Sequence, residues 1–213
     1  MSKTQALADR ASEITRRRYN RIASLYDFNE ALAERLRFAA WRRLLWSKIE
    51  GKRILEVGVG TGKNFPYYPP AVEMTAIDFS EKMLRRAEAK VEKQDIKVVL
   101  KLMDVQRLEF EDESFDTVVA TFVFCSVPDA VKGLAEVRRV LRLGGKVVLL
   151  EHVLSANRVL AWFMNLANPM VVRVMGANIN RRTVENVEKG GLKLEKVTNL
   201  GASIVKLIEA RKV

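Results

Sequence analysis

The residues best suited to bind a small molecule form a glycine-rich segment with the pattern E-x-G-x-G-x-G. Glu56 is followed by Gly58, Gly60 and Gly62, directly after the apolar residues of RILEV. Glycine adopts positive φ angles and lets a ligand approach the backbone. A ligand-binding turn therefore explains three glycines at this spacing better than packing alone does. A second acidic residue, Asp78, ends the apolar run MTAID, where a carboxylate can accept hydrogen bonds from ribose hydroxyls.

Two common phosphate-binding glycine motifs do not fit this segment. The dinucleotide motif G-x-G-x-x-G, read from Gly58, places Lys63 where the third glycine belongs. The motif G-x-x-x-x-G-K-[ST], ending at Gly62-Lys63, meets Val57 in place of its first glycine and Asn64 in place of its hydroxyl residue. The turn therefore binds a different nucleoside-type ligand or is purely structural.

Hydrophobic periodicity places this turn within an alternation of strands and helices. Apolar runs predict strands and amphipathic stretches predict helices. The predicted strands are 53–57, 71–77, 96–104, 116–127 and 143–153, and the helices between them include 81–93, with Ser80 as its N-cap, and 130–142. Such an alternation implies a parallel, doubly wound sheet, whose ligands gather beyond the carboxyl ends of its strands.

Several residues with useful chemistry converge on that edge of the predicted sheet. Besides the glycine turn and Asp78, they are Asp104, Cys125 with Ser126, and Glu151 with His152. Cys125 is interpreted as a core residue, because its strand is apolar on both faces and nothing basic adjoins it in sequence. His152 can accept a proton from a nucleophile or orient it, or else be a hydrogen-bonded structural residue, and Glu151 can contact an ammonium group.

At these positions the sequence resembles class I S-adenosylmethionine-dependent methyltransferases, whose first motif has this form and whose second strand ends in an acid. The resemblance implies S-adenosyl-L-methionine as cofactor and S-adenosyl-L-homocysteine as product. It implies an α/β fold with a doubly wound, mostly parallel seven-stranded sheet, completed by an antiparallel hairpin that the alternation over 192–209 also predicts. Asp104 would bind the adenine amine or, alternatively, only end its strand. The cofactor residues implied are Glu56, Gly58, Gly60, Gly62, Asp78, Phe79, Met83, Met103, Asp104, Tyr19 and Phe124.

The segment before the glycine turn is predicted to be helical over 3–18 and 29–49. Between these helices, Y-x-x-I-A-x-x-Y-D resembles the segment that covers the cofactor in methyltransferases of the ubiquinone/menaquinone and phospholipid types. The resemblance implies that Tyr19 and Tyr26 lie on the cofactor side, with Tyr26 a catalytic candidate, and ordinary helix packing is the alternative. We therefore predict an N-terminal helical lid, residues 1–50, on one compact methyltransferase domain, residues 51–213.

The segments GVGTGKNFPYYP, TFVFCSVPD, LLEHV and NINRRT resemble bacterial phospholipid (phosphatidylethanolamine) N-methyltransferases. The resemblance implies methylation of a lipid amine, with His152 and Glu151 as catalytic candidates and Asn180, Arg181 and Arg182 at the substrate, where arginine binds phosphate well. The apolar residues 157–176 are predicted to form a pair of helices that wall an apolar pocket. Sister enzymes methylate quinones or thiols, so a hydrophobic small-molecule acceptor stays open. A non-catalytic cofactor-binding or membrane-docking protein is the alternative from another class.

The net charge of +11 is confined to the flanks: +7 over residues 1–53, −2 over 54–154 and +6 over 155–213. Such flanks are solvated or bind an anionic partner such as lipid head groups or RNA. We expect no nucleic acid, because no RNA-binding module and no N/D-P-P-Y motif is present, and no metal, because the chain has one cysteine and one histidine. Without a signal-like start or an apolar run of roughly 18 residues, we expect a cytoplasmic protein that can lie peripherally on the inner face of the membrane.

Overall fold

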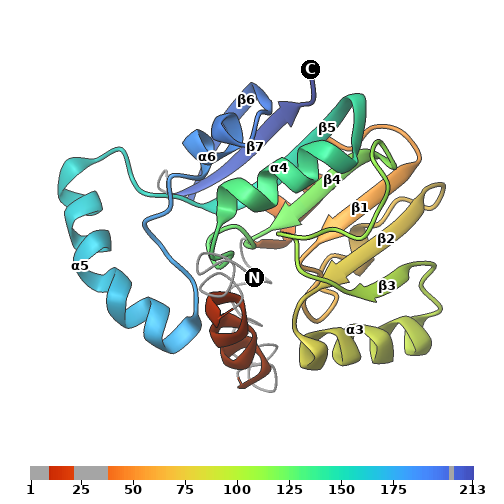
Figure 1. Ribbon diagram of the computed structural model, residues 1–213, viewed down its shortest axis with the longest axis horizontal. Helices are drawn as coiled ribbons and strands as arrows, with labels where there is room; N and C mark the ends of the chain where they lie inside the picture. The colour runs from red at the N-terminus through yellow and green to blue at the C-terminus, as the bar shows by residue number, and fades with distance from the viewer. Residues whose placement is uncertain (1–9, 22–37, 202–203) are drawn as a thin grey trace.

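The computed structural model describes residues 10–21, 38–201 and 204–213, and its centre is a seven-stranded sheet (Figure 1). The strand order is β3-β2-β1-β4-β5-β7-β6, and β7 runs antiparallel to both of its neighbours. The strands are β1 (Arg53–Val57), β2 (Glu73–Asp78), β3 (Val99–Leu102), β4 (Phe115–Thr121), β5 (Leu141–His152), β6 (Lys193–Leu200) and β7 (Val205–Arg211). The predicted doubly wound, mostly parallel sheet with a C-terminal antiparallel hairpin is confirmed.

Helices cover both faces of this sheet. They are α2 (Ala39–Trp46), the short 3-10 helix η2 (Phe65–Tyr67), α3 (Glu81–Gln94), α4 (Ala130–Val140), α5 (Arg158–Met175) and α6 (Thr183–Lys189), and a further helical segment spans 10–21. Because side chains alternate across a strand, neighbouring residues of β1 enter different core clusters. Ile54 packs with Leu45 of α2, whereas Leu55 packs with Leu134 of α4.

The capping signal predicted for α3 is present. Ser80 has extended backbone geometry, and its Oγ accepts a hydrogen bond from the Met83 N–H at 3.3 Å. The helix ends at Asp95, which adopts the left-handed conformation with φ of 50°. These two residues fix the helix so that its first turn begins directly after Asp78, at the carboxyl edge of the sheet.

Strands β3, β4 and β5 differ from their predicted bounds, and β3, predicted over 96–104, spans only Val99–Leu102. The prediction that the fourth strand reaches residue 127 is wrong: β4 ends at Thr121, and Phe122 adopts a φ of 57° that turns the chain. The predicted turn at Gly144-Gly145 lies inside β5, where the pairing jumps from Phe115↔Leu141 to Thr117↔Lys146. Burial explains the error at β4, since the residues after Phe122 remain in the core after the strand has ended.

The apolar region 157–176 forms one helix, α5, so the predicted pair of helices is wrong. The helix continues through Pro169 and ends at Gly176, which has a φ of 78°. A proline inside a helix removes one backbone hydrogen bond. Because Pro169 is exposed, the carbonyl that loses its donor lies on a turn of the helix near solvent. Figure 1 shows α5 at the edge of the molecule, set apart from the sheet.

Candidate active site

A cavity opens at the carboxyl edge of the sheet, beyond the ends of β1, β2 and β4. Eight of the residues predicted to bind the cofactor line it. They are Tyr19, Gly58, Gly60, Asp78, Phe79, Met83, Met103 and Asp104. The structure therefore brings the glycine turn, both acids and a tyrosine from the N-terminal helix together around one space.

The glycine turn forms the floor of this cavity. The N–H groups of Gly58 and Val59 both donate to the Ile77 carbonyl, at 2.8 and 2.9 Å, which ties the turn to β2. Gly60 has a φ of 58°, and a Cβ placed there would have no described heavy atom within 4 Å. A side chain at Gly60 would therefore project into the cavity, which is the position a closely bound ligand needs. Gly62 does not line the cavity, because its Cα faces the ring of Phe65.

Asp78 lies beside the turn with its carboxylate held by the backbone. One oxygen accepts from the Gly60 N–H and the other from the Ser80 N–H, both at 2.8 Å. Burial raises the pKa of Asp78 from its ordinary value to about 6, and the two backbone donors only partly oppose this. Each carboxylate oxygen can accept more than one hydrogen bond, so Asp78 can still receive a pair of ligand hydroxyls. The open cradle over Gly60 and this acid together fit a nucleoside ligand.

Glu56 lies beneath the turn and does not line the cavity. Its carboxylate accepts hydrogen bonds from the Tyr68 hydroxyl and, at 2.6 Å, from Asn64 Nδ2, while Asn64 Oδ1 accepts from Arg42 at 2.8 Å. Burial raises the pKa of Glu56, and these donors lower it. The first acid of the motif therefore joins α2, η2 and β1 below the glycine turn.

The far side of the cavity contains Asp104 and a residue that sequence reasoning missed. Gln106 lines the cavity, and its Nε2 donates to Asp104 Oδ2 at 3.1 Å and to Ser12 Oγ at 2.9 Å. Its side-chain oxygen accepts from the Asp129 N–H at the start of α4, at 3.0 Å. Gln106 thus connects the acid, α4 and the N-terminal helix. A glutamine within a turn-rich loop carries no periodic or motif signal that would identify it.

The N-terminal helix, residues 10–21, closes one side of the cavity. Tyr19 lines the cavity and meets Phe79 edge-on, with 5.8 Å between ring centroids. Asn20 Oδ1 accepts from Ser80 Oγ at 2.7 Å, directly beside Asp78. Tyr26, the catalytic candidate, lies outside the described residues.

Glu151 and Phe124 lie behind the cavity wall. Glu151 Oε1 accepts from the N–H groups of Val123 and Phe124, at 2.8 and 3.0 Å, and no described residue gives Oε2 a hydrogen-bond partner. Burial raises the pKa of Glu151 to about 7. Phe124 is fully buried in the core under α4. The carboxylate therefore holds the loop that follows β4, and Val123 of this loop does line the cavity.

His152 does not line the cavity, but it contacts a residue that does. Its ring stacks on Phe122 with 4.5 Å between centroids and 29° between planes. The ring centroids of Phe122 and Phe38 are in turn 5.3 Å apart. The strained φ of Phe122 thus coincides with an aromatic cluster at the cavity wall.

Arg181 and Arg182 line a second cavity, together with Thr183 and Lys206. Arg181 Nη2 donates to the Val127 carbonyl at 2.7 Å, and Val127 also lines the first cavity, so the two spaces are neighbours. No described residue offers a hydrogen-bond partner to Arg181 Nε or Thr183 Oγ1. Asn180 lies outside this lining and donates to Asn165 Oδ1 of α5 at 2.9 Å.

Within the described part of the chain, no three His, Cys, Asp or Glu side chains gather as metal ligands would. None of the described helices combines the length and the apolar character that crossing a bilayer requires.

The chain is similar to several known methyltransferases. The profile described as "Methyltransferase domain" matches residues 55–149. Phosphatidylethanolamine N-methyltransferase of Cereibacter sphaeroides is 49% identical over 104 residues, 48% of this chain and 51% of its own length. Human thiol S-methyltransferase TMT1A is 30% identical over 189 residues, 83% of this chain and 75% of its own. The ubiquinone/menaquinone C-methyltransferase UbiE of Geobacter sp. (strain M21) is 32% identical over 155 residues, 68% and 66% of the two chains.

A solved structure shows the same fold. The SAM-dependent methyltransferase of Thermotoga maritima superimposes with a TM-score of 0.70 at 19% identity, covering 92% of this chain and 99% of that one. The chain spans 51% to 58% of the length of the first curated relatives that it matches. The glycine turn, the two acids at the sheet edge and these similarities lead to one conclusion: the chain belongs to the S-adenosylmethionine-dependent methyltransferase family, whose cofactor is S-adenosylmethionine.

Proposed function

We propose that the protein transfers the methyl group of S-adenosylmethionine to the amine of a phospholipid head group. The observation that carries this proposal is the basic cavity lined by Arg181, Arg182 and Lys206. It adjoins the cofactor cavity, because Arg181 donates a hydrogen bond to the carbonyl of Val127. The similarity to a phosphatidylethanolamine N-methyltransferase supports it. A phosphate bound by arginine in the second cavity would direct the neighbouring amine toward the first.

The cofactor, when bound, supplies an electrophilic methyl group on a sulfonium. The protein must then align the acceptor and exclude water, and it needs no metal to do so. We assign ribose binding to Asp78 and adenine binding to Asp104 with Met103. Tyr19 and the N-terminal helix would shield the site from solvent.

Glu151 and His152 would act as positioning residues, because neither lines the cavity. Glu151 holds the N–H groups of Val123 and Phe124, and His152 supports the ring of Phe122. Both side chains would thus fix the wall against which the acceptor lies. Tyr26 stays a catalytic prediction from the sequence.

Two other functions are alternatives to phospholipid methylation. Relatives named as C- and S-methyltransferases favour a hydrophobic quinone precursor or a thiol as acceptor. A non-catalytic cofactor-binding role is the candidate of a different class, because this fold also hosts other functions.

Methyl-labelled cofactor distinguishes these functions. The protein is incubated with phosphatidylethanolamine vesicles, a demethylated quinone and an alkyl thiol in separate reactions. We expect label in the lipid, and we expect Arg182→Ala with Lys206→Ala to raise the KM for lipid about tenfold while the KM for cofactor is unchanged. Lys189→Ala, an exposed cation on α6, is the matched control.

Label in the quinone or the thiol alone would contradict the phospholipid acceptor. Cofactor binding with no label in any acceptor would favour the non-catalytic role.

A further inference from the structure

The outer side of α5 carries a continuous row of exposed apolar side chains. Val159, Trp162, Phe163, Leu166 and Met170 are each between 55% and 73% exposed. At 3.6 residues per turn their spacing of three, four, seven and eleven residues places them within an arc of about 100° of the helix. We call these five residues the α5 apolar face. Soluble surfaces rarely expose such a row without a partner.

The opposite side of α5 is fixed to the protein by polar contacts. Asn168 Oδ1 accepts from the Ile179 N–H at 2.9 Å, and Asn180 donates to Asn165. In the segment that follows α5, the Asn178 N–H donates to the Cys125 carbonyl at 2.8 Å. Cys125 lies in the loop beside the cofactor cavity. The helix therefore presents its apolar face outward, while its inner side connects to the wall of the site.

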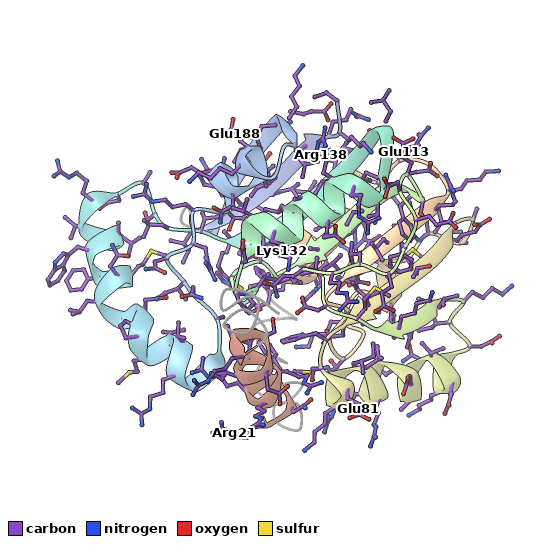
Figure 2. The ribbon with its side chains drawn as sticks, in the orientation of Figure 1. Arg21, Glu81, Glu113, Lys132, Arg138 and Glu188 are labelled. Atoms are coloured by element: carbon purple, nitrogen blue, oxygen red, sulfur yellow. The ribbon has the colours of Figure 1, made fainter. Side chains whose placement is uncertain are left out.

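The surroundings of the α5 apolar face are basic. No Asp or Glu occurs between Glu151 and Glu185, whereas Arg158, Arg173, Arg181 and Arg182 do. The N-terminal helix adds further arginines and lies against the end of α5, since a Cβ at Gly176 would come 3.4 Å from the Tyr19 ring. Figure 2 shows Arg21 at the outer end of that helix, away from the sheet.

We propose that the α5 apolar face docks the protein on an anionic lipid bilayer, with α5 lying in the plane of the surface. An apolar row bordered by arginines is the composition that enters the boundary between anionic head groups and acyl chains. A second copy of this chain would bring the same positive charges together, so self-association through this face is disfavoured. This inference rests on the proposed function in one respect: if the acceptor is a phospholipid, docking through α5 would bring its head group to the edge of the cofactor cavity.

The test measures binding to vesicles without any methyl transfer. Vesicles of phosphatidylglycerol with phosphatidylcholine are sedimented with the wild-type protein and with Trp162→Ser/Phe163→Ser. We expect the variant to need about tenfold more lipid for half-maximal binding, because two large apolar side chains no longer enter the bilayer. We also expect wild-type binding to fall at high salt and on pure phosphatidylcholine.

Leu143→Ser is the matched control, because Leu143 is 69% exposed but lies at the opposite end of β5 from α5. Its binding should equal that of the wild type. Cofactor affinity, measured by calorimetry, should be the same in all three proteins, which shows that they are folded.

The proposal is overturned if the α5 variant binds vesicles as the wild type does, or if the wild type does not bind anionic vesicles at low salt. It is also overturned if the wild type is a dimer in solution that the α5 substitutions dissociate. Failure of lipid methylation with intact vesicle binding would instead contradict the proposed function alone.

Discussion

Asp78 is a carboxyl group whose burial lets its neutral form persist to a higher pH than in an exposed aspartate. Two backbone N–H groups satisfy one lone pair on each oxygen, and burial raises its pKa to about 6. Hydroxyl donors from a bound ribose would stabilise the ionised form. Cofactor binding and ionisation of Asp78 should therefore be coupled.

We predict that Asp78→Asn weakens cofactor binding by about tenfold to a hundredfold at pH 8, since hydrogen bonds to a charged acceptor are lost. In the wild type, affinity should rise with pH up to about 6 and then level off, because below that pH binding must first displace a proton. The variant should show no such rise. Calorimetric titrations between pH 5 and 8 measure both effects.

Asp95→Asn provides the control, because Asp95 is exposed at the end of α3 and its left-handed backbone tolerates asparagine. An equal loss of affinity in the two variants would refute the assigned role of Asp78.

Among the elements, the N-terminal helix is attached to the rim of the candidate cofactor cavity by specific hydrogen bonds. Asn20 accepts from Ser80 at the N-cap of α3, and Ser12 accepts from Gln106. The helix also carries an ion pair of Arg17 with Glu13, and this pair contributes little because the Arg17 side chain is 75% exposed. The side toward the cavity should therefore control how fast the cofactor leaves.

Asn20→Ala is expected to increase the dissociation rate of the cofactor about threefold to tenfold, because it removes the acceptor of the hydrogen bond from Ser80 Oγ and of the longer one from the Lys82 N–H. Arg17→Ala, on the same helix, should leave that rate unchanged. Stopped-flow displacement with excess S-adenosylhomocysteine measures the rates. Equal rates in both variants and the wild type would mean that this helix does not retain the cofactor.

Local patterns were sufficient for some elements and not for others. Ser80 and the amphipathic run after it predicted α3, and the alternation over 192–209 predicted β6 and β7. The end of β4 was mispredicted because Phe124 and Cys125 are buried in a turn, and burial alone does not distinguish a turn from a strand.

The same distinction applies to the candidate site. Gly58, Gly60 and Asp78 follow from the ends of β1 and β2, which were predicted to within one residue, and Asp104 follows from the third strand, which was predicted two residues too long at this end. Gln106 could not be found in this way, since its partner Ser12 lies 94 residues away and only the tertiary fold brings them together. Over 157–176 the sequence predicted two helices, whereas asparagine side chains such as that of Asn168 anchor one continuous helix, α5.

Across the whole molecule, buried carboxylates gather at the edge of the sheet that carries the site. Burial raises the pKa of Glu56, that of Asp78 to about 6 and that of Glu151 to about 7. Their ionised forms cost folding free energy, which the hydrogen-bond donors around them only partly offset. The edge that carries the candidate site is therefore less stable at neutral pH than the packing of the sheet would allow.

The stability of the whole protein should consequently fall as the pH rises from 5 to 8. Between the ordinary pKa of 4.5 and the folded value of about 7, folded Glu151 keeps a proton that the unfolded chain has lost, so the free energy of unfolding decreases through this window. Glu151→Gln keeps an oxygen for the N–H groups of Val123 and Phe124 but cannot ionise. Between pH 5 and pH 8, the free energy of unfolding of Glu151→Gln should rise relative to that of the wild type by on the order of 2 kcal/mol, as measured by urea unfolding.

Glu136→Gln is the control. Because Arg139 lowers the pKa of Glu136, the effect of this substitution on the free energy of unfolding should be constant over this pH range. Parallel stability curves for the wild type and Glu151→Gln would show that Glu151 is already ionised throughout, and that the loop after β4 is held by a charge rather than by a protonated acid.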